Sequence, residues 1–345
     1  MGTDQANQVL EVDVPAPVDF RGRTILVISP RFFGYELRIV EHLRSRGARV
    51  DYLNERLGDS AVVKVMLRLA TALMKRFSRR YFRRSIERLA GKSYDDVLII
   101  SPESCDSEVV QWLRGAFPGA RFILYMWDSF ENKFPRGVEP YLQLFDKCLT
   151  FDERDAATYA IEFRPLFFCD EGPVEGGQPD FAFSFVGTIH SDRYRILRTM
   201  VACADAAKLP YFIYPYLPTR LHYWLFRVIK REFKGRRLSD FMFRGMPYQD
   251  VLEVLRSSFA IVDVEHPGQQ GLTMRTLEVL GAGKKLITTN VNIKKYSFYN
   301  SNEIFILDRL NPEVPTTFFR EPRGMPSKEF NGAYGLTGWA NSIFQ

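Results

Sequence analysis

The sequence predicts an α/β protein made of two Rossmann-like domains, each with a parallel sheet covered by helices. Three observations lead to this prediction. A chain of 345 residues is long enough for two cores, short apolar runs alternate with amphipathic stretches along it, and this alternation pauses once in the middle. Because the apolar runs lack a polar face, they indicate strands buried on both sides, as in parallel sheets.

The first domain is expected over residues 21–168. Its predicted strands are the apolar runs at 24–29, 96–101, 121–126 and 147–151. Helical periodicity between them predicts helices at 35–46 and 106–116. The preceding residues 1–20 have neither a basic start nor an apolar run, so we expect a tail rather than a secretory signal.

A linker is expected at residues 169–180, which are rich in Gly, Pro and acidic residues and have no apolar periodicity. The second domain is then expected over residues 181–325, followed by a C-terminal segment, 326–345, with a short helix at 335–344. Its predicted strands are 181–187, 210–214, 259–264, 285–289 and 304–307, and its predicted helices are 191–207, 247–257 and 272–282. In such sheets, ligands bind beyond the carboxyl ends of the strands.

Several common active-site patterns do not occur in the sequence. There is no GxGxxG after the first predicted strand, no GxxxxGK[ST] phosphate loop and no GxSxG nucleophile elbow. The four histidines lack metal-ligand spacing and no DxD pair occurs, so we expect no metal site, with Asp263-Val264-Glu265 as the weak alternative. The four cysteines are far apart and are expected to be free thiols. No apolar run is long enough to predict a spanning helix.

Positive charge is concentrated in two segments, of which the first is residues 60–92, with ten Lys/Arg against one Glu. Apolar residues recur there at three- and four-residue steps, as in Leu73, Phe77 and Tyr81, and predict a basic amphipathic helix. Such a helix suits an anionic membrane surface, or it packs on a domain and leaves a solvated basic face. Nucleic-acid binding is a third alternative, but no recognition signature accompanies the charge.

The second basic segment, residues 219–237, repeats this pattern on a smaller scale, with seven Lys/Arg against one Glu. Tyr223, Trp224 and Phe226 give it an aromatic, apolar side. That side could contact lipid, but we favour a helix that turns it toward the core.

Two loops of the second domain carry residues suited to a phosphate. In the first loop, Gly187 and Thr188 are expected to turn from a strand into a helix. Small residues allow backbone N–H groups to approach a phosphate, the helix N-terminus adds partial positive charge, and Arg193 adds a full charge. The alternative is a plain strand–helix turn capped by Ser191 or Asp192.

The second loop follows the predicted strand 259–264, and a helix is expected to begin near Gly271. Thr273, Arg275 and Glu278 lie in its first two turns, and the spacing of three places Arg275 and Glu278 on one face. This arrangement suits a nucleoside diphosphate, with backbone amides and Arg275 on phosphate and Glu278 accepting from ribose hydroxyls. An ordinary surface salt bridge between Arg275 and Glu278 is the alternative.

Several phrases of the sequence resemble one known family. They are YMWDSF (125–130), FDERDAATYAIEFRPLFF (151–168), QQGLTMRTLEVLGAGKKLITTN (269–290), YSFYNSNEIFILDR (296–309) and GWANSIF (338–344). They resemble GT-B glycosyltransferases, and most of all the bacterial capsular, exopolysaccharide and lipopolysaccharide biosynthesis proteins of that class. The resemblance covers most of the chain and implies the GT-B fold, with two Rossmann-like parallel-sheet domains facing a cleft.

The resemblance also implies an activity, which is transfer of a sugar from a nucleotide-sugar donor to a glycan acceptor that is often lipid-linked. It implies no cofactor and no essential metal. The partners it implies are the donor and the acceptor. Together with the basic segment 60–92, which would hold the enzyme near a lipid-linked acceptor, we expect an anionic inner-membrane surface as a further partner and no nucleic acid. The expected location is cytoplasmic, peripheral on the inner face of the cytoplasmic membrane.

Three further donor contacts are expected in the same loop, at His266, Gln269 and Gln270. Many relatives carry Glu where this chain has Gln270. An amide can hydrogen-bond a sugar hydroxyl but carries no charge. The residues at the end of the next strand, 288–290, are expected beside the same pocket.

On the acceptor side, Asp128 follows the predicted strand 121–126 and is the candidate catalytic base. Inverting transfer needs a base to take the proton of the acceptor hydroxyl, whereas a retaining mechanism does not. Asp128 could instead cap a helix or position substrate. Phe32 and Phe33 could stack on a sugar or lipid, or belong to the core. Other readings of the fold are a nucleotide-sugar epimerase or another nucleotide-activated group transferase, and a nucleic-acid binder is least favoured.

Overall fold

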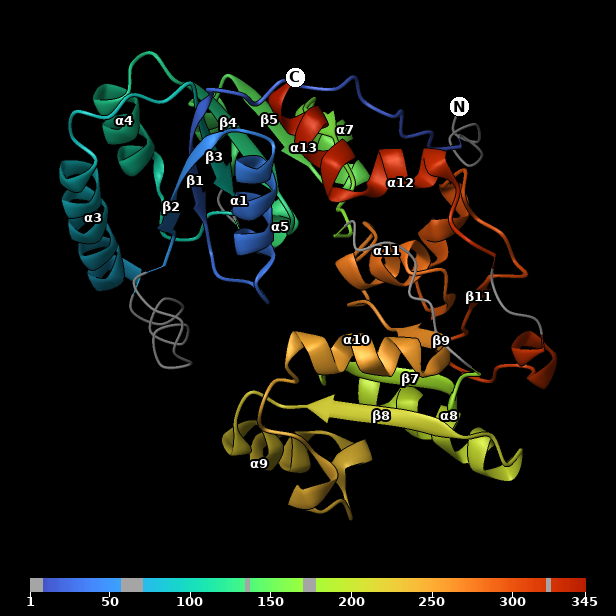
Figure 1. The fold of residues 1–345 in the computed structure, drawn as a ribbon. Helices are drawn as coiled ribbons and strands as arrows, with labels where there is room; N and C mark the ends of the chain where they lie inside the picture. Colours follow the sequence, from blue (N-terminus) through green and yellow to red (C-terminus); the bar gives the residue numbers. More distant parts are fainter. Residues whose placement is uncertain (1–8, 57–70, 134–136, 170–177, 321–323) are drawn as a thin grey trace, which may run out of the picture. The chain divides into compact units, whose positions relative to one another are not determined.

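The computed structural model describes residues 9–56, 71–133, 137–169, 178–320 and 324–345 (Figure 1). The chain divides into two compact units. The six-stranded unit contains Val14–Cys169 and Gly332–Gln345, and the five-stranded unit contains Met1–Asp13 and Asp170–Asn331. Every described strand pair in both sheets is parallel, which confirms the predicted α/β class with two parallel sheets.

The sheet of the six-stranded unit has the strand order β2-β1-β3-β4-β5-β6. Its strands are β1 (Thr24–Ser29), β2 (Arg49–Asn54), β3 (Asp96–Ile100), β4 (Arg121–Met126), β5 (Lys147–Thr150) and β6 (Glu162–Phe163). The described helices around it are α1 (Tyr35–Ser45), α3 (Thr71–Arg88), α4 (Ser107–Ala116), α5 (Phe130–Lys133), α6 (Glu139–Leu142), α7 (Glu153–Tyr159) and α13 (Leu336–Phe344). The edge strands β2 and β6 were not predicted, since neither has a continuous apolar run.

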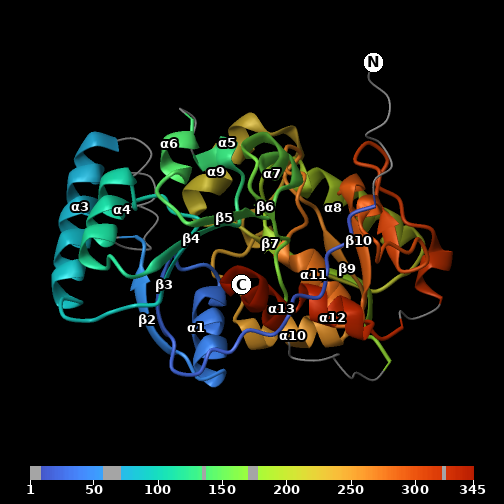
Figure 2. The same cartoon turned by 90° about the horizontal axis from the view of Figure 1, so that it is seen from above.

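Alternate residues of the central strands serve two cores. Leu26 and Ile28 of β1 belong to the core that also contains Phe82 of α3 and Val109 of α4. On the other face, α1 lies beside α13, as Figure 2 shows. There Trp339 is fully buried, with its ring centroid 5.1 Å from that of Tyr125 on β4 and 4.8 Å from that of Phe167. The C-terminal helix is therefore part of the core of this unit.

The first basic segment coincides only partly with described structure. Residues 57–70 lie outside the described part, and α3 covers the remainder up to Arg88. The predicted apolar face is wrong at Phe77, which is 50% exposed, because the buried side of α3 runs through Ser78, Phe82 and Ser85 instead. The exposed side of α3 instead carries a row of arginines, which we call the α3 stripe: Arg76, Arg80, Arg84 and Arg88.

The sheet of the five-stranded unit has the order β11-β10-β9-β7-β8. Its strands are β7 (Phe181–Thr188), β8 (Tyr211–Tyr216), β9 (Ser258–Asp263), β10 (Lys285–Thr288) and β11 (Ile304–Ile306). The helices are α8 (Arg193–Ala206), α9 (Arg220–Ile229), α10 (Tyr248–Arg256) and α11 (Met274–Gly281), and α12 (Lys328–Tyr334) leads out of the unit. The predicted strands of this half all exist, with ends shifted by one or two residues.

The helix predicted in the second basic segment is α9, and the expectation that its aromatic side faces the core is only half right. Tyr223 is buried and Phe226 packs against the same core. Trp224 points the other way and is 53% exposed. The aromatic residues were grouped by composition, but a helix places neighbours in sequence about 100° apart, so they cannot share one side.

All four cysteines are free thiols, as predicted. Across the described residues, no helix is both long and apolar enough to cross a membrane.

Gly338 in α13 provides a test of this packing. A Cβ atom built on Gly338 would lie 1.9 Å from the carbonyl oxygen of Gly332, a contact that only a backbone shift can relieve. We expect Gly338→Ala to lower the free energy of unfolding by about 1–3 kcal/mol or more, in the range for overpacking. The measurement is urea unfolding followed by circular dichroism.

Gly115 in α4 is the matched control, because it is a helical glycine whose added Cβ would meet nothing within 4 Å. Gly115→Ala is expected to leave stability unchanged or raise it by about 0.5–1 kcal/mol. Equal effects of the two substitutions would contradict the close approach at Gly338.

Candidate functional site

The carboxyl edge of the five-stranded sheet contains the predicted donor residues. The chain passes from β7 to β8 on one side and continues through β9, β10 and β11 on the other. The sheet order therefore reverses between β7 and β9. In open parallel sheets this switch point is where the loops diverge and leave a crevice for ligands.

Arg193 spans this switch point. It is the first residue of α8, and its Nη1 donates to the carbonyl oxygen of Thr188, the last residue of β7, at 2.8 Å. Its Nε donates to the carbonyl oxygen of Val264, directly after β9. Burial lowers the pKa of Arg193, and the nearby charges of Asp263 and others act against that effect. Two of its donors are thus used to join strand ends, whereas the sequence predicted a phosphate contact.

The predicted turn at Gly187 and Thr188 lies further along the chain, because β7 continues through Thr188. Gly187 pairs with Pro215 of β8, and a Cβ at this position would lie 3.0 Å from the ring of Phe185. Glycine thus leaves room for this ring within the strand. The turn itself is at Ser191, which has a left-handed backbone with φ of 46°.

His190 and His266 face each other at the ends of β7 and β9, with ring centroids 5.9 Å apart. His266 is exposed, and its Nδ1 accepts from the backbone N–H of Gly268 at 3.3 Å. Burial lowers the pKa of His190 to about 3, and the charge of Arg193 acts in the same direction. The His190 imidazole is therefore neutral near pH 7, while His266 is open to solvent.

The start of α11 is capped from inside the fold. Thr273 is its N-cap, and the Thr273 hydroxyl accepts from the backbone N–H of Thr276 at 3.1 Å. Both threonine hydroxyls donate to Oδ2 of Asp263, at 2.5 Å from Thr273 and 2.7 Å from Thr276. The helix begins at Met274, three residues after the predicted start near Gly271. Asp263 at the end of β9 is thereby fixed against the helix N-terminus, whose dipole favours its negative charge.

A second set of charges lies beside the first and centres on Arg309. Its Nη2 donates to the carboxylate and to the carbonyl oxygen of Glu265, the latter at 2.9 Å, and its Nη1 donates to Asp192 at 2.8 Å. Thr289 donates to the same Glu265 carboxylate at 2.5 Å. Burial raises the pKa of Glu265. This network connects the loops after β7, β9, β10 and β11.

The alternative that Asp263 and Glu265 hold a metal can be compared with the hydrogen bonds that their carboxylates accept. Each carboxylate receives hydrogen bonds from two protein groups. Among the residues that the structure describes, no group of three or more His, Cys, Asp and Glu side chains is arranged to hold a metal ion.

The loop between β9 and α11 is held by side-chain amides. Nε2 of Gln269 donates to the carbonyl oxygen of Gly271 at 3.0 Å. Nδ2 of Asn290, after β10, donates to the carbonyl oxygens of Gln270 and Gly271, both at 3.3 Å. Gly271 is buried, whereas the side chains of Gln269 and Gln270 are half-buried at the surface of the loop. Asn290 thus lies beside the predicted donor residues, as expected.

Arg275 and Glu278 form the ion pair that the spacing allows, with 3.3 Å between Nη1 and Oε2. Their side chains retain 27% and 14% exposure, so each keeps part of its surface open to solvent. Arg275 is also close enough to Arg193 for its charge to act on the pKa of Arg193. The pair therefore belongs to the same charged surface as the strand ends.

The candidate base Asp128 lies in the six-stranded unit, at the carboxyl end of β4. It is half-buried, and its Oδ1 accepts from the backbone N–H of Ser129 at 3.1 Å. The following residue, Phe130, donates its backbone N–H to Asp155 of α7 at 2.8 Å. Asp155 thus fixes the segment that carries Asp128.

Aromatic rings surround the same strand end. The ring of Phe32 lies 5.6 Å from that of Trp127, the residue before Asp128. Phe32 is 40% exposed and Phe33 is 72% exposed, so neither belongs to the core. Phe33 and Gly34 both have positive φ, at 52° and 85°, which turns the loop after β1 sharply. Exposed rings beside a carboxylate are suited to stacking on a sugar.

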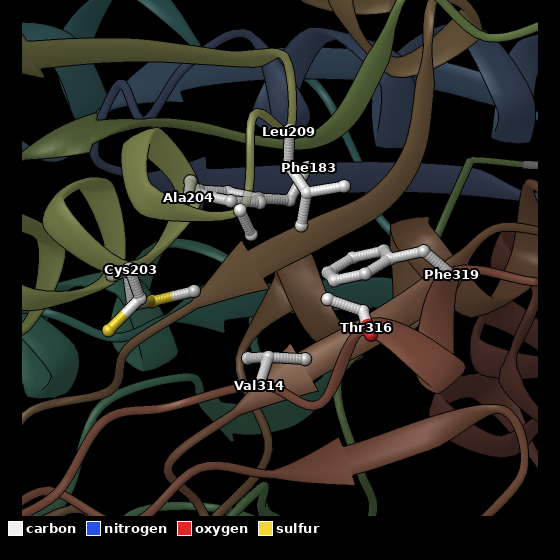
Figure 3. Close-up of a pocket in the computed structure, with 9 residues that line it drawn as sticks. Phe183, Cys203, Ala204, Leu209, Val314, Thr316 and Phe319 are labelled. Carbon is white, nitrogen blue, oxygen red and sulfur yellow. The ribbon is translucent and has the colours of Figure 1, made fainter.

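A pocket of the five-stranded unit lies away from this chemistry (Figure 3). Phe183 near the start of β7, Leu209 before β8 and Phe319 face one another there, so it is at the amino end of the sheet. Its volume is about 30 Å³, enough for a few water molecules and too small for a nucleotide.

The sequence reasoning missed Arg309, His190 and Asp155. Arg309 follows β11 by three residues, so the rule that sites follow strand ends could have found it. His190 also follows a strand, but only its burial distinguishes it. Asp155 had no signal, because its partner Phe130 is 25 residues away.

Comparison with known proteins identifies the fold through solved structures and not through related sequences. The sequence matches no family model and no curated protein. An α-glucosyltransferase in complex with UDP and a mismatched DNA has a TM-score of 0.61 at 11% identity, over 93% of this chain and 94% of its own. The UDP-GlcNAc 2-epimerase of Methanocaldococcus jannaschii, with UDP-GlcNAc and UDP, has a TM-score of 0.53 at 10% identity, over 93% and 98%. HepE of Anabaena, with UDP and glucose, has 0.51 at 10% identity, over 92% and 94%.

At such identities the likeness is one of fold alone. The fold class of this chain is GT-B, as predicted, with a Rossmann-like parallel sheet in each unit.

The half-buried imidazole of His190 allows this edge of the sheet to be tested by changing the pH. As pH falls, the unfolded chain takes up a proton near the ordinary pKa of 6.5, whereas folded His190 does so only near 3. Acidification through this window therefore favours unfolding, by about 2 kcal/mol at pH 5. We expect the loss of unfolding free energy between pH 7.5 and pH 5.0 to be smaller in His190→Asn by about that amount. The measurement is urea unfolding at both pH values, and equal losses would contradict the assignment.

Proposed function

We propose that the protein is a glycosyltransferase that transfers a sugar from a nucleotide-sugar donor to a glycan acceptor. The observation that carries the proposal is the charged, hydrogen-bonded carboxyl edge of the five-stranded sheet, at the switch point between β7 and β9. Three structures that share the fold are complexes with UDP or a UDP-sugar. This likeness of fold supports a nucleotide-sugar as the ligand.

The donor would bind over the start of α11. Because Arg193 already donates to Thr188 and Val264, we assign the phosphate contact mainly to Arg275 and to the backbone of residues 266–271. The part of Glu278 left exposed would accept from ribose hydroxyls. The half-buried Gln270 and exposed His266 would contact the sugar or the phosphate nearest to it.

The reaction would proceed without an essential metal. Glu265 already receives Arg309 and Thr289, and Asp263 receives Thr273 and Thr276. The positive charge that stabilises the leaving diphosphate would come instead from arginine and from the helix N-terminus.

Asp128 would act as the base in an inverting transfer, taking the proton of the acceptor hydroxyl as that oxygen attacks the anomeric carbon. The exposed rings of Phe32 and Phe33 beside Trp127 would hold the acceptor sugar by stacking.

The acceptor would be a lipid-linked glycan of surface polysaccharide synthesis, and the protein would work on the inner face of the cytoplasmic membrane. The α3 stripe supports this part of the proposal, because its exposed arginines match an anionic lipid surface. The neighbouring Arg79 pairs with Asp106 and Glu108, and Arg83 lies over the ring of Trp112, so these two are less available to lipid. Nucleic acid is not among the proposed partners.

The donor site is tested by a thermal-shift screen against UDP, GDP, dTDP, CMP and their sugars. A ligand at a hundred times its dissociation constant should stabilise the protein by about 2.7 kcal/mol. Arg275→Gln and Glu278→Gln should each weaken the bound nucleotide about tenfold or more, since each removes a charge-assisted hydrogen bond worth about 1.5–3 kcal/mol.

The control is Arg256→Gln, which breaks an ion pair of the same spacing with Glu253 on α10, where the side chains are 47% and 75% exposed. It should leave nucleotide affinity unchanged. Stabilisation by none of the nucleotides would refute the donor site.

The reaction is tested by product analysis with a labelled donor. Asp128→Asn should lower transfer by about 10²–10⁴-fold while leaving nucleotide affinity unchanged. Turnover close to wild type would show that Asp128 is not the base, as in a retaining mechanism. The epimerase alternative, which the likeness to a UDP-GlcNAc 2-epimerase favours, predicts an epimeric nucleotide-sugar, with the sugar still joined to the diphosphate, when no acceptor is present.

A further inference from the structure

The outer side of α9 is an apolar surface that the described part of the unit leaves uncovered. Leu221 is 75% exposed, Leu225 52% and Val228 79%. Trp224 and Ile229 on the same side are 53% and 63% exposed. The positions 221, 224, 225 and 228 follow the spacing that places side chains on one face of a helix.

The opposite side of α9 is fixed to the core, so the apolar side cannot turn inward. Tyr223 is 1% exposed, and its ring lies 5.6 Å from that of Phe241. The Tyr223 hydroxyl donates to the carbonyl oxygen of Arg236 at 2.7 Å, and Phe226 packs on Phe233 at 5.3 Å. The N-cap Thr219 accepts from the backbone of the first turn. The outward face is therefore a property of the folded unit.

Exposed basic residues are concentrated in α9 and in the segment that follows it. Residues 218–244 contain eight Lys/Arg against Glu232 and Asp240. The guanidinium of Arg227 lies over the Trp224 ring, 5.4 Å from its centroid. The exposed basic residues are Arg220, Arg227, Arg231, Lys234, Arg237 and Arg244. Long basic side chains next to an apolar row can reach outward to charged groups while their stems stay among apolar atoms.

We propose that α9 is a lipid-binding helix that lies in the surface of an anionic bilayer, with Leu221, Trp224, Leu225 and Val228 inserted among the acyl chains. These exposed basic residues select this occupant, because headgroups supply negative charge at the level where the acyl chains begin. The helix follows the edge strand β8 in the chain after a short connection, within the five-stranded unit (Figure 1). The inference goes beyond the proposed function, since it holds whether or not the protein transfers a sugar.

The test uses the full-length protein and sucrose-loaded vesicles, either pure phosphatidylcholine or with 30% phosphatidylglycerol. We expect sedimentation with the anionic vesicles. The variant Leu221→Ser/Leu225→Ser/Val228→Ser should lower the partition coefficient at least tenfold, and a part of wild-type binding should survive 0.5 M NaCl, because insertion is not screened by salt.

The α3 stripe provides the matched comparison. Arg76→Gln/Arg80→Gln/Arg84→Gln should weaken binding at low salt, and should leave the salt-resistant part unchanged. The triple serine variant should remove that resistant part. It replaces exposed residues, so its circular dichroism and its thermal shift with UDP should match wild type. Loss of the UDP response in every variant and in wild type would count against the donor site and not against α9.

Trp224 reports insertion directly. Brominated acyl chains should quench the tryptophan fluorescence of the wild type, and Trp224→Phe should abolish most of this quenching. Equal quenching in Trp224→Phe, or equal vesicle binding of the triple serine variant, would overturn the proposal. So would a wild-type protein that ignores the vesicles and forms a dimer that the serine substitutions dissociate.

Discussion

The guanidinium of Arg193 joins the ends of the two strands between which the five-stranded sheet reverses its order. Its bonds to the carbonyl oxygens of Thr188 and Val264 supply donors where the sheet can supply none. Around it, Arg309 connects Asp192 to Glu265, and Asp263 is fixed to the start of α11. Four loops are thereby joined by hydrogen bonds, and Arg275 and His266 lie near them with part of their surface exposed.

The sequence was sufficient to predict the strands that are buried on both faces of the sheet. The apolar runs 24–29 and 121–126 coincide with β1 and β4, because both faces of a central parallel strand are covered. The edge strand β2 escaped prediction, since Arg49 and Asp51 alternate with its apolar residues. A strand at the edge of a sheet needs only one buried face. A short segment in which polar and apolar residues alternate is therefore a weak sequence signal for a strand.

The same reasoning explains which site residues could be predicted. The placement of Thr273, Arg275 and Glu278 in the first turns of one helix was predicted, because helix spacing brings them together. The bonds of Arg193 to the strand ends were not predicted, because a positive charge near a predicted phosphate site does not reveal which carbonyl oxygens lie within its reach. Which side of α9 faces the core could not be predicted from the sequence, for a related reason. Most of its perimeter is apolar, and only the folded unit determines which part is covered.

The packing of Trp339 against Tyr125 and Phe167 has a consequence for biosynthesis. The half that the ribosome makes first cannot close its own core, since Gly332–Gln345 completes it. The half made second is nearly continuous in sequence and already complete when those last residues emerge. Nascent chains usually fold from the N-terminus onward; here the order of completion is reversed, and a partly exposed sheet must wait through the synthesis of the other unit.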